Sequence, residues 1–186
     1  MTRPRGRPVQ GTGVSRDDIL TAALVLLDED GGQGLTMRAL AKRLGVTAMS
    51  LYHHVGDYDG LLRALSDRVY AEVLEGADVL SDPGAEIRAL LTRYHHAVGK
   101  HPPLTLAIFA TPEAFAGVVR HITDRLTVLL AEMTDEPLLW RDILIDHAHG
   151  SGLALVSAQG KQMQVQKLEA QYQQALDRLL ERLANK

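Results

Sequence analysis

Apolar residues recur every three or four positions along most of the chain, which is the spacing of α-helices packed on one face. Glycine and proline residues separate these runs. The pattern predicts helices at about 15–30, 36–44, 47–55, 61–79, 82–100, 104–110, 113–133, 137–159 and 161–184. We therefore expect an all-α fold of about nine helices.

Residues 36–55 predict two short helices joined by a tight turn. Thr36 and Thr47 stand where N-caps are needed, and Gly45 stands where the first helix must end. The outward-facing side chains of the second helix would be Tyr52, His53 and His54. This arrangement is a helix-turn-helix, whose second helix enters the major groove of DNA. An ordinary pair of packed helices is the alternative interpretation of the pattern alone.

Composition places the chain among folded proteins, with 186 residues of which 46% are hydrophobic and 23% charged. It has no cysteine, which excludes disulfides and cysteine-ligated zinc. We see no signal peptide and no apolar run of the roughly 18 residues that a membrane span needs. We expect a cytoplasmic protein that does not enter a membrane.

The formal net charge is −3, but two segments are basic and contain no acid. Residues 1–14 hold three arginines, and residues 33–56 hold Arg38, Lys42 and Arg43. Together these segments carry +6, so the remainder carries −9. Such a protein can bind a polyanion through its basic segments while its acidic body repels it.

Residues 1–14 are rich in glycine, proline and arginine and predict a flexible arm. Its core, Pro4-Arg5-Gly6-Arg7-Pro8, resembles an AT-hook, in which the two arginines reach along a narrow minor groove. A solvated basic tail is the alternative. The adjacent helix-turn-helix favours DNA contact by Arg5 and Arg7.

The run G-x-T-M-R-A-L-A-K-R-L-G-V-T-x-x-S-L-Y-H-H-V, followed by a helix that opens with two leucines, resembles the DNA-binding domain of TetR-like (tetracycline repressor) transcriptional regulators over roughly residues 15–70. The resemblance implies a three-helix DNA-binding domain over 15–60 and an effector-binding and dimerisation domain over 61–186. Relatives commonly carry a phosphate-contacting lysine just before the fourth helix. This chain has Asp57-Tyr58-Asp59 there, which weakens the expected phosphate contact.

The resemblance and the arm together predict the residues that contact DNA. Tyr52 and His54 would bond phosphates, and Ala48 and Met49 would offer apolar contact to thymine methyl groups. The recognition helix has no Arg, Asn or Gln for a bidentate base contact, so the arm and DNA shape would carry more of the specificity. Surface exposure without DNA contact is the alternative for His53 and His54. The full predicted set is Arg5, Arg7, Thr36, Arg38, Thr47, Ala48, Met49, Tyr52, His53 and His54.

The resemblance also implies a pocket for a small, largely apolar effector in the C-terminal domain. Its candidate lining residues are Tyr94, Phe109, Phe115, His121 and His147. Phe, Met and Leu at helical spacing more often belong to core packing than to a ligand wall. His121 with Arg125 would hold an anionic ligand or form a surface pair. A metal site built from His95 or His96 with His147 and an acid is an open alternative, but we expect no metal and no cofactor.

The last two predicted helices, 137–159 and 161–184, carry a small-residue face and a seam of apolar residues. We favour a two-fold four-helix interface over packing within one chain. The leading hypothesis is a homodimeric repressor that binds a near-palindromic operator and is released by an effector. One alternative is a small-molecule binding protein on the same fold with weak or lost DNA binding. The other is a helical enzyme, but no catalytic motif supports one.

Overall fold

The computed structural model describes residues 13–29, 32–75, 82–111, 116–158 and 160–184, which contain nine α-helices and no strand. This confirms the predicted all-α fold. The elements are α1 (Arg16–Glu29), α2 (Met37–Leu44), α3 (Ala48–Val55), α4 (Tyr58–Leu74), α5 (Pro83–Lys100), α6 (Pro102–Phe109), α7 (Val118–Ala131), α8 (Pro137–Ala154), the 3-10 turn η2 (Leu155–Ala158) and α9 (Gln162–Ala184).

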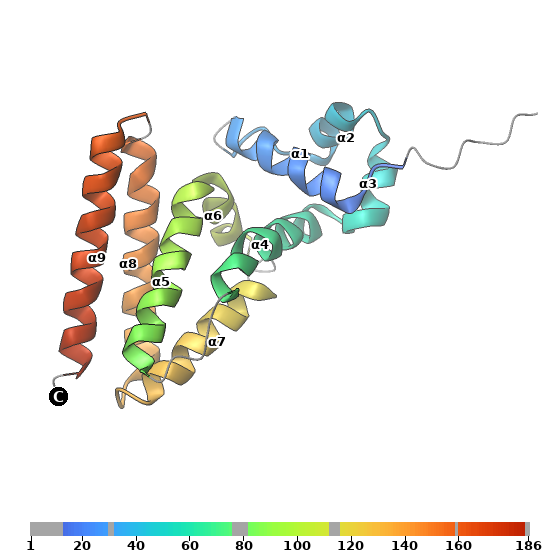
Figure 1. The fold of residues 1–186 in the computed structure, drawn as a ribbon. Coiled ribbons are helices and arrows are strands. Elements are labelled where there is room, and N and C mark those ends of the chain that lie inside the picture. The colour runs from blue at the N-terminus through green and yellow to red at the C-terminus, as the bar shows by residue number, and fades with distance from the viewer. Residues whose placement is uncertain (1–12, 30–31, 76–81, 112–115, 159, 185–186) are drawn as a thin grey trace, which may run out of the picture.

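Helices α1, α2 and α3 form a small unit at one end of the molecule, and α8 and α9 stand as an antiparallel pair at the other (Figure 1). Between them, α4 leads from α3 into the C-terminal bundle, where α5 lies beside α8. The predicted boundary between residues 60 and 61 falls inside α4. This helix therefore connects the two parts without a flexible linker.

Helix α4 begins three residues before the predicted start, because Asp57 caps it. The Asp57 carboxylate accepts a hydrogen bond from the Gly60 backbone N–H at 2.8 Å. Gly56, with φ +78°, makes the break after α3, whereas Gly60 lies inside α4. A Cβ at Gly60 would come within 2.2 Å of the Val55 carbonyl oxygen, so glycine is needed there for α4 to leave α3 closely. The sequence pattern predicts a turn over the whole of residues 56–60, but only residues 56 and 57 lie between α3 and α4.

The predicted end of α4 at residue 79 is also late, since the helix ends at Leu74. Helix α7 was predicted from residue 113, but it begins at Val118 after Gly117, whose φ of +84° interrupts the helix. The Asp67 side chain of α4 accepts a hydrogen bond from the Val118 N–H at 2.9 Å and so replaces a local cap. Helix α8 gives way to a 3-10 turn at Leu155, short of the predicted end at residue 159.

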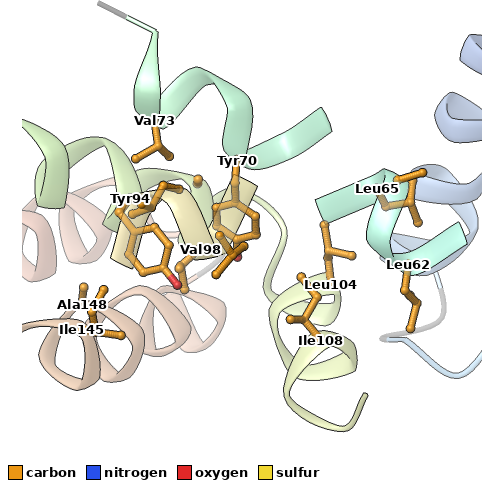
Figure 2. Close-up of a cluster of buried hydrophobic side chains, with 14 of the residues drawn as sticks. Leu62, Leu65, Tyr70, Val73, Tyr94, Val98, Leu104, Ile108, Ile145 and Ala148 are labelled. Atoms are coloured by element: carbon orange, nitrogen blue, oxygen red, sulfur yellow. The ribbon is translucent and has the colours of Figure 1, made fainter. Parts of the chain in front are cut away.

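Buried apolar side chains form one continuous core from α1 to α9. In Figure 2, Leu62 and Leu65 of α4 lie near Leu104 and Ile108 of α6. Elsewhere in the same view, a second group joins α4, α5 and α8: Tyr70, Val73, Tyr94, Val98, Ile145 and Ala148. Helix α4 also contacts α1 and α3, so a movement of this helix affects both the unit of α1, α2 and α3 and the C-terminal bundle. No helix in the described ranges is long and apolar enough to cross a membrane.

Candidate nucleic-acid interface and effector cluster

The turn between α2 and α3 has the geometry that its sequence predicts. Thr36 accepts a hydrogen bond from the Ala39 N–H at 3.0 Å, and Thr47 accepts one from the Ser50 N–H at 3.2 Å. Gly45 adopts the left-handed conformation, with φ +67° and ψ +27°. The two caps and this glycine fix the direction in which α3 leaves α2.

Helix α3 divides into a buried and an exposed face. Leu51 and Val55 are buried against the core. Met49 is 65% exposed and Tyr52 is 44% exposed, while His53 and His54 are also exposed. Ala48 is half-buried and packs against the core edge, so its contact with any partner is smaller than that of Met49.

The cations of α2 have two different environments. Arg43 donates two hydrogen bonds to the Glu29 carboxylate, at 2.6 and 3.1 Å, and so ties α2 to the end of α1. This interaction lowers the pKa of the exposed Glu29 carboxyl group. Arg38 and Lys42 are exposed on the same helix. The local positive charge available to a polyanion therefore comes mainly from these two residues.

Three of the predicted site residues lie outside the described residues: Arg5 and Arg7 of the arm, and Phe115. Thr36, Arg38 and Thr47 lie at the starts of α2 and α3 and are exposed. Together with Met49, Tyr52, His53 and His54 they border one surface.

A buried polar cluster lies among α4, α5, α6 and α8. The Tyr94 hydroxyl is 2.6 Å from His149 Nε2, and the Tyr70 hydroxyl is 2.8 Å from Thr105 Oγ1. The rings of Tyr70 and Tyr94 lie 5.4 Å apart, side by side in Figure 2, and the Phe109 ring meets that of His149 edge-on at 4.6 Å. These side chains leave a cavity of only about 10 Å³, so the cluster is nearly filled.

Burial sets the protonation of this cluster. It raises the pKa of Tyr70 to about 12, with the Thr105 hydrogen bond opposing the shift, and it raises the pKa of Tyr94 as well. Burial lowers the pKa of His149, against a smaller opposing effect of Asp146. Both tyrosines and the histidine are therefore neutral near pH 7, and the cluster offers hydrogen bonds to a ligand without a charge.

Outside the cluster, a second hollow of about 450 Å³ opens to the surface. Phe109 and His149 line both the small cavity and this hollow, so the two spaces adjoin at these side chains. Asp142 and Asp146 of α8 lie in the outer hollow, and Asp142 pairs with Arg141 at 2.7 Å.

The structure brings Tyr94 and Phe109 together but places the other two described candidates elsewhere. His121 is exposed on α7, and His147 stacks on Tyr172 of α9 with ring centroids 5.2 Å apart. Arg125 does not pair with His121, because it donates to the buried Glu86 carboxylate at 2.5 and 2.7 Å.

Sequence reasoning missed His149, Tyr70 and Thr105. The available signal was that His147 and His149 are two residues apart and cannot share a helix face, which left open which of them faces inward.

His95 also contacts Tyr172, in a stack with centroids 3.8 Å apart, and its Nε2 lies 3.1 Å from Ser151 Oγ. His95 and His147 thus flank an aromatic ring. In the part of the chain that the structure describes, no three His, Asp or Glu side chains are grouped closely enough to hold a metal ion.

We compared the sequence and the fold with those of known proteins. The family model described as bacterial regulatory proteins, tetR family, matches residues 19–65, which cover α1 to the first half of α4. Over these residues the chain is similar to the TetR family, which supports a TetR-like regulator. Members of this family regulate transcription and are not enzymes.

Relatives in sequence agree with this similarity. An uncharacterised HTH-type transcriptional regulator of Mycobacterium tuberculosis is 34% identical over 116 residues, which cover 54% of this chain and 53% of that protein. The class E tetracycline repressor protein of Escherichia coli is 41% identical over 59 residues, or 32% of this chain and 28% of the repressor. The chain thus matches about half or less of the length of these curated relatives.

Solved structures extend the similarity to the whole fold. BioQ of Mycobacterium smegmatis superposes with a TM-score of 0.76 at 23% identity, over 92% of this chain and 98% of BioQ. A TetR variant of Acinetobacter baumannii, solved in complex with minocycline, superposes with a TM-score of 0.71 at 21% identity, over 93% and 99% of the two chains. At these identities the similarity establishes the fold of this chain, not its ligands.

Proposed function

We propose that this TetR-like chain is a transcriptional repressor that binds a near-palindromic operator as a homodimer and leaves it when a small, largely apolar effector binds. The observation that carries the proposal is the exposed face of α3, where Met49 and Tyr52 stand free of the core at the end of the molecule opposite α8 and α9 (Figure 1). A capped, rigidly seated helix with such a face fits a major groove.

The chemistry of this surface sets the expected contacts. Tyr52 and His54 would bond phosphate oxygens, and Met49 would meet thymine methyl groups. Arg38 at the start of α2 would add a phosphate contact, and Arg5 and Arg7 would reach into the minor groove. BioQ has been solved with its natural double-stranded DNA operator, which supports the same use of the shared fold.

The outer faces of α8 and α9 support dimer formation. Leu139 is 52% exposed and Ile143 is 38% exposed on successive turns of α8, and Met163 of α9 is 86% exposed. Farther along α8, Gly150 is exposed, and a Cβ added there would meet nothing within 4 Å. Two copies joined at this face would bury the apolar groups and present two α3 helices to half-sites about one turn (~34 Å) apart.

The buried cluster around Tyr94 and His149 is the proposed effector site. An apolar ligand with one polar group would enter through the outer hollow, displace Phe109 and bond to Tyr94 or His149. Because the cavity is nearly filled without a ligand, binding must open it. An effector therefore favours a different arrangement of the bundle from the nearly filled one, which is the condition for a switch.

Helix α4 would transmit this change. It is bonded to the start of α7 through Asp67 and Val118, and its first turn packs against α3. At the other end of the interdomain contact, His101 Nδ1 lies 3.1 Å from the Asp28 carboxylate of α1. Movement of α6 or α7 around a ligand would thus reorient the unit of α1, α2 and α3 (the DNA-side unit).

The direct test is a gel shift of the full chain on the DNA that flanks its own gene. The proposal predicts a specific shift at moderate salt that survives an excess of unrelated competitor DNA. No specific shift would contradict repression. If the same sample then gained thermal stability with apolar ligands, the alternative of a ligand-binding protein that has lost DNA binding would replace it.

A further inference from the structure

A separate, open cavity of about 520 Å³ lies where α1, α4 and α5 meet. It shares no lining residue with the buried cluster around Tyr94 and His149. Arg68 of α4 and Arg93 of α5 line it, two positions and one position away from Tyr70 and Tyr94, so it faces other sides of the same two helices. Its volume lies within the range of about 300–1,000 Å³ typical of small-molecule sites.

The described lining of this cavity is rich in cations. It includes Arg68, Arg93 and Lys100 against one carboxylate, that of Glu72. Arg68 is already paired with Asp17 of α1, at 2.9 Å. This local excess of positive charge contrasts with the formal net charge of −3 for the whole chain. The cavity therefore attracts a ligand of negative charge.

Two of the cations have hydrogen-bonding capacity that the described residues do not use. The Nε of Arg93 donates to the Val73 carbonyl oxygen at 2.8 Å, but its Nη2 is buried without a partner. Lys100 is exposed, and no carboxylate in the described ranges forms an ion pair with it. A guanidinium or ammonium group without a counter-charge beside a cavity is a ready anion ligand.

The rest of the cavity wall indicates the chemistry of the part of the ligand that is not anionic. Leu24 of α1, Val69 and Val73 of α4, and Ala97 of α5 supply an apolar surface beside the cations. A fully hydrated inorganic ion would leave that surface in contact with water. An organic anion with a short hydrocarbon body covers it and gains the free energy of apolar burial.

We propose that the cavity between α1, α4 and α5 is a second ligand site, which takes a small organic anion such as a medium-chain carboxylate. The exposed Lys100 ammonium group holds the anionic group, the nearby Arg93 guanidinium adds positive charge to the wall, and the apolar wall holds the hydrocarbon body. This site is distinct from the buried effector cluster, and its binding does not depend on the function proposed above.

The position of the site gives it a consequence for DNA binding, and only this consequence rests on the proposed function. Leu24 belongs to α1 in the DNA-side unit, whereas Lys100 belongs to α5 in the bundle. A ligand between them fixes the angle between the two parts. Its affinity then differs between the DNA-bound and free arrangements, and by reciprocity it shifts DNA affinity by the same factor.

The test is a fluorescence titration of the full chain with anilinonaphthalene sulfonate, an apolar anion, followed by displacement with octanoate or octanol. Lys100→Gln should weaken probe affinity about fivefold, and Lys100→Arg should keep it. Lys167→Gln, which removes an exposed lysine of α9, should leave it unchanged. Octanoate should displace the probe at concentrations where octanol does not.

Equal probe affinity in wild type and Lys100→Gln, or equal displacement by octanoate and octanol, would overturn the proposal. Circular dichroism of Lys100→Gln keeps a folding defect from being read as a binding defect. The titration contains no DNA, so its failure is distinguishable from failure of the gel shift.

Discussion

The side chains on the exposed face of α3 differ in what they would give to DNA. Tyr52 and His54 supply hydrogen bonds to phosphates, which are made to any sequence. Tyr52→Phe or His54→Gln should therefore weaken binding to specific and unrelated duplexes alike, each by about three- to tenfold. Fluorescence anisotropy with both duplexes measures this.

His121→Gln is the matched control, because His121 is exposed on α7, far from α3 in the chain. It should bind both duplexes as wild type does. If Tyr52→Phe and His54→Gln also matched wild type, these side chains would have no contact with phosphate, and simple exposure would be the correct interpretation of α3.

His95 makes stability depend on pH. Burial lowers its pKa to about 4, with repulsion from His147 and His96 adding to the effect. The folded state thus prefers the neutral ring, so its contribution is complete above the ordinary pKa of about 6.5 and is lost as pH falls from there toward 4.

His95→Gln should therefore reduce the loss of unfolding free energy between pH 7 and pH 5 by about 2 kcal/mol. Urea unfolding at the two pH values measures it, with His121→Gln as the exposed control. An undiminished pH dependence in His95→Gln would show that His95 is not the buried neutral group that the stack on Tyr172 implies.

Local chemistry explains which residues were predictable. The caps at Thr36 and Thr47 and the left-handed Gly45 depend only on neighbours within a few positions, and the structure confirms them. The partners of His149 depend on the rotation of α8 against α5 and α6, which no local pattern fixes. Arg43 was counted among free basic residues because its partner, Glu29, lies 14 positions away.

At the scale of the helices, the junction of α4 and α7 is sensitive to a small change. Gly117 has φ +84°, and a Cβ there would lie 2.3 Å from Asp67 Oδ1. Gly117→Ala should therefore lower the unfolding free energy by about 2 kcal/mol. It should also weaken any effect of an effector on DNA binding, because Asp67 bonds the start of α7.

Gly84→Ala is the control for this change. Gly84 lies in α5, and a Cβ added there would meet the Met133 side chain at an ordinary 3.6 Å. It should unfold close to wild type in thermal denaturation. A Gly117→Ala protein as stable as Gly84→Ala would mean that the Asp67 contact does not constrain the start of α7.

Helices as such were predictable because their apolar spacing is a property of the sequence, but several boundaries were not, and two of them show why. Gly60 was interpreted as a turn residue, although it serves close packing inside α4. Helix α7 starts late because its first free N–H is bonded by Asp67, 51 positions earlier. Both errors arise where a tertiary contact overrides local propensity.

At the level of the whole molecule, the outer face of α8 is predicted to join two copies. Ile143→Asp places a charge on this face and should convert the dimer to a monomer in light scattering, with the helical circular dichroism spectrum unchanged. Val128→Asp is the matched control, since Val128 is 55% exposed on α7. A dimeric Ile143→Asp protein would place the interface elsewhere.

The overall organisation of the molecule was predictable from the sequence, but its cavities were not. The all-α fold and the helix-turn-helix follow from periodicity, caps and motif. The cavity of about 520 Å³ is formed by three helices that are distant in the chain, so only their packing reveals it. The same holds for the nearly filled state of the cluster around Tyr94.

Footprinting of the DNA that flanks the gene tests the central claim, that two α3 helices read one operator. We expect two protected, symmetry-related half-sites whose centres are about one helical turn, or ~10 base pairs, apart. Protection should weaken in Tyr52→Phe and require higher protein concentration in Ile143→Asp. A single asymmetric protected segment, or none at concentrations that saturate the probe site, would contradict the account.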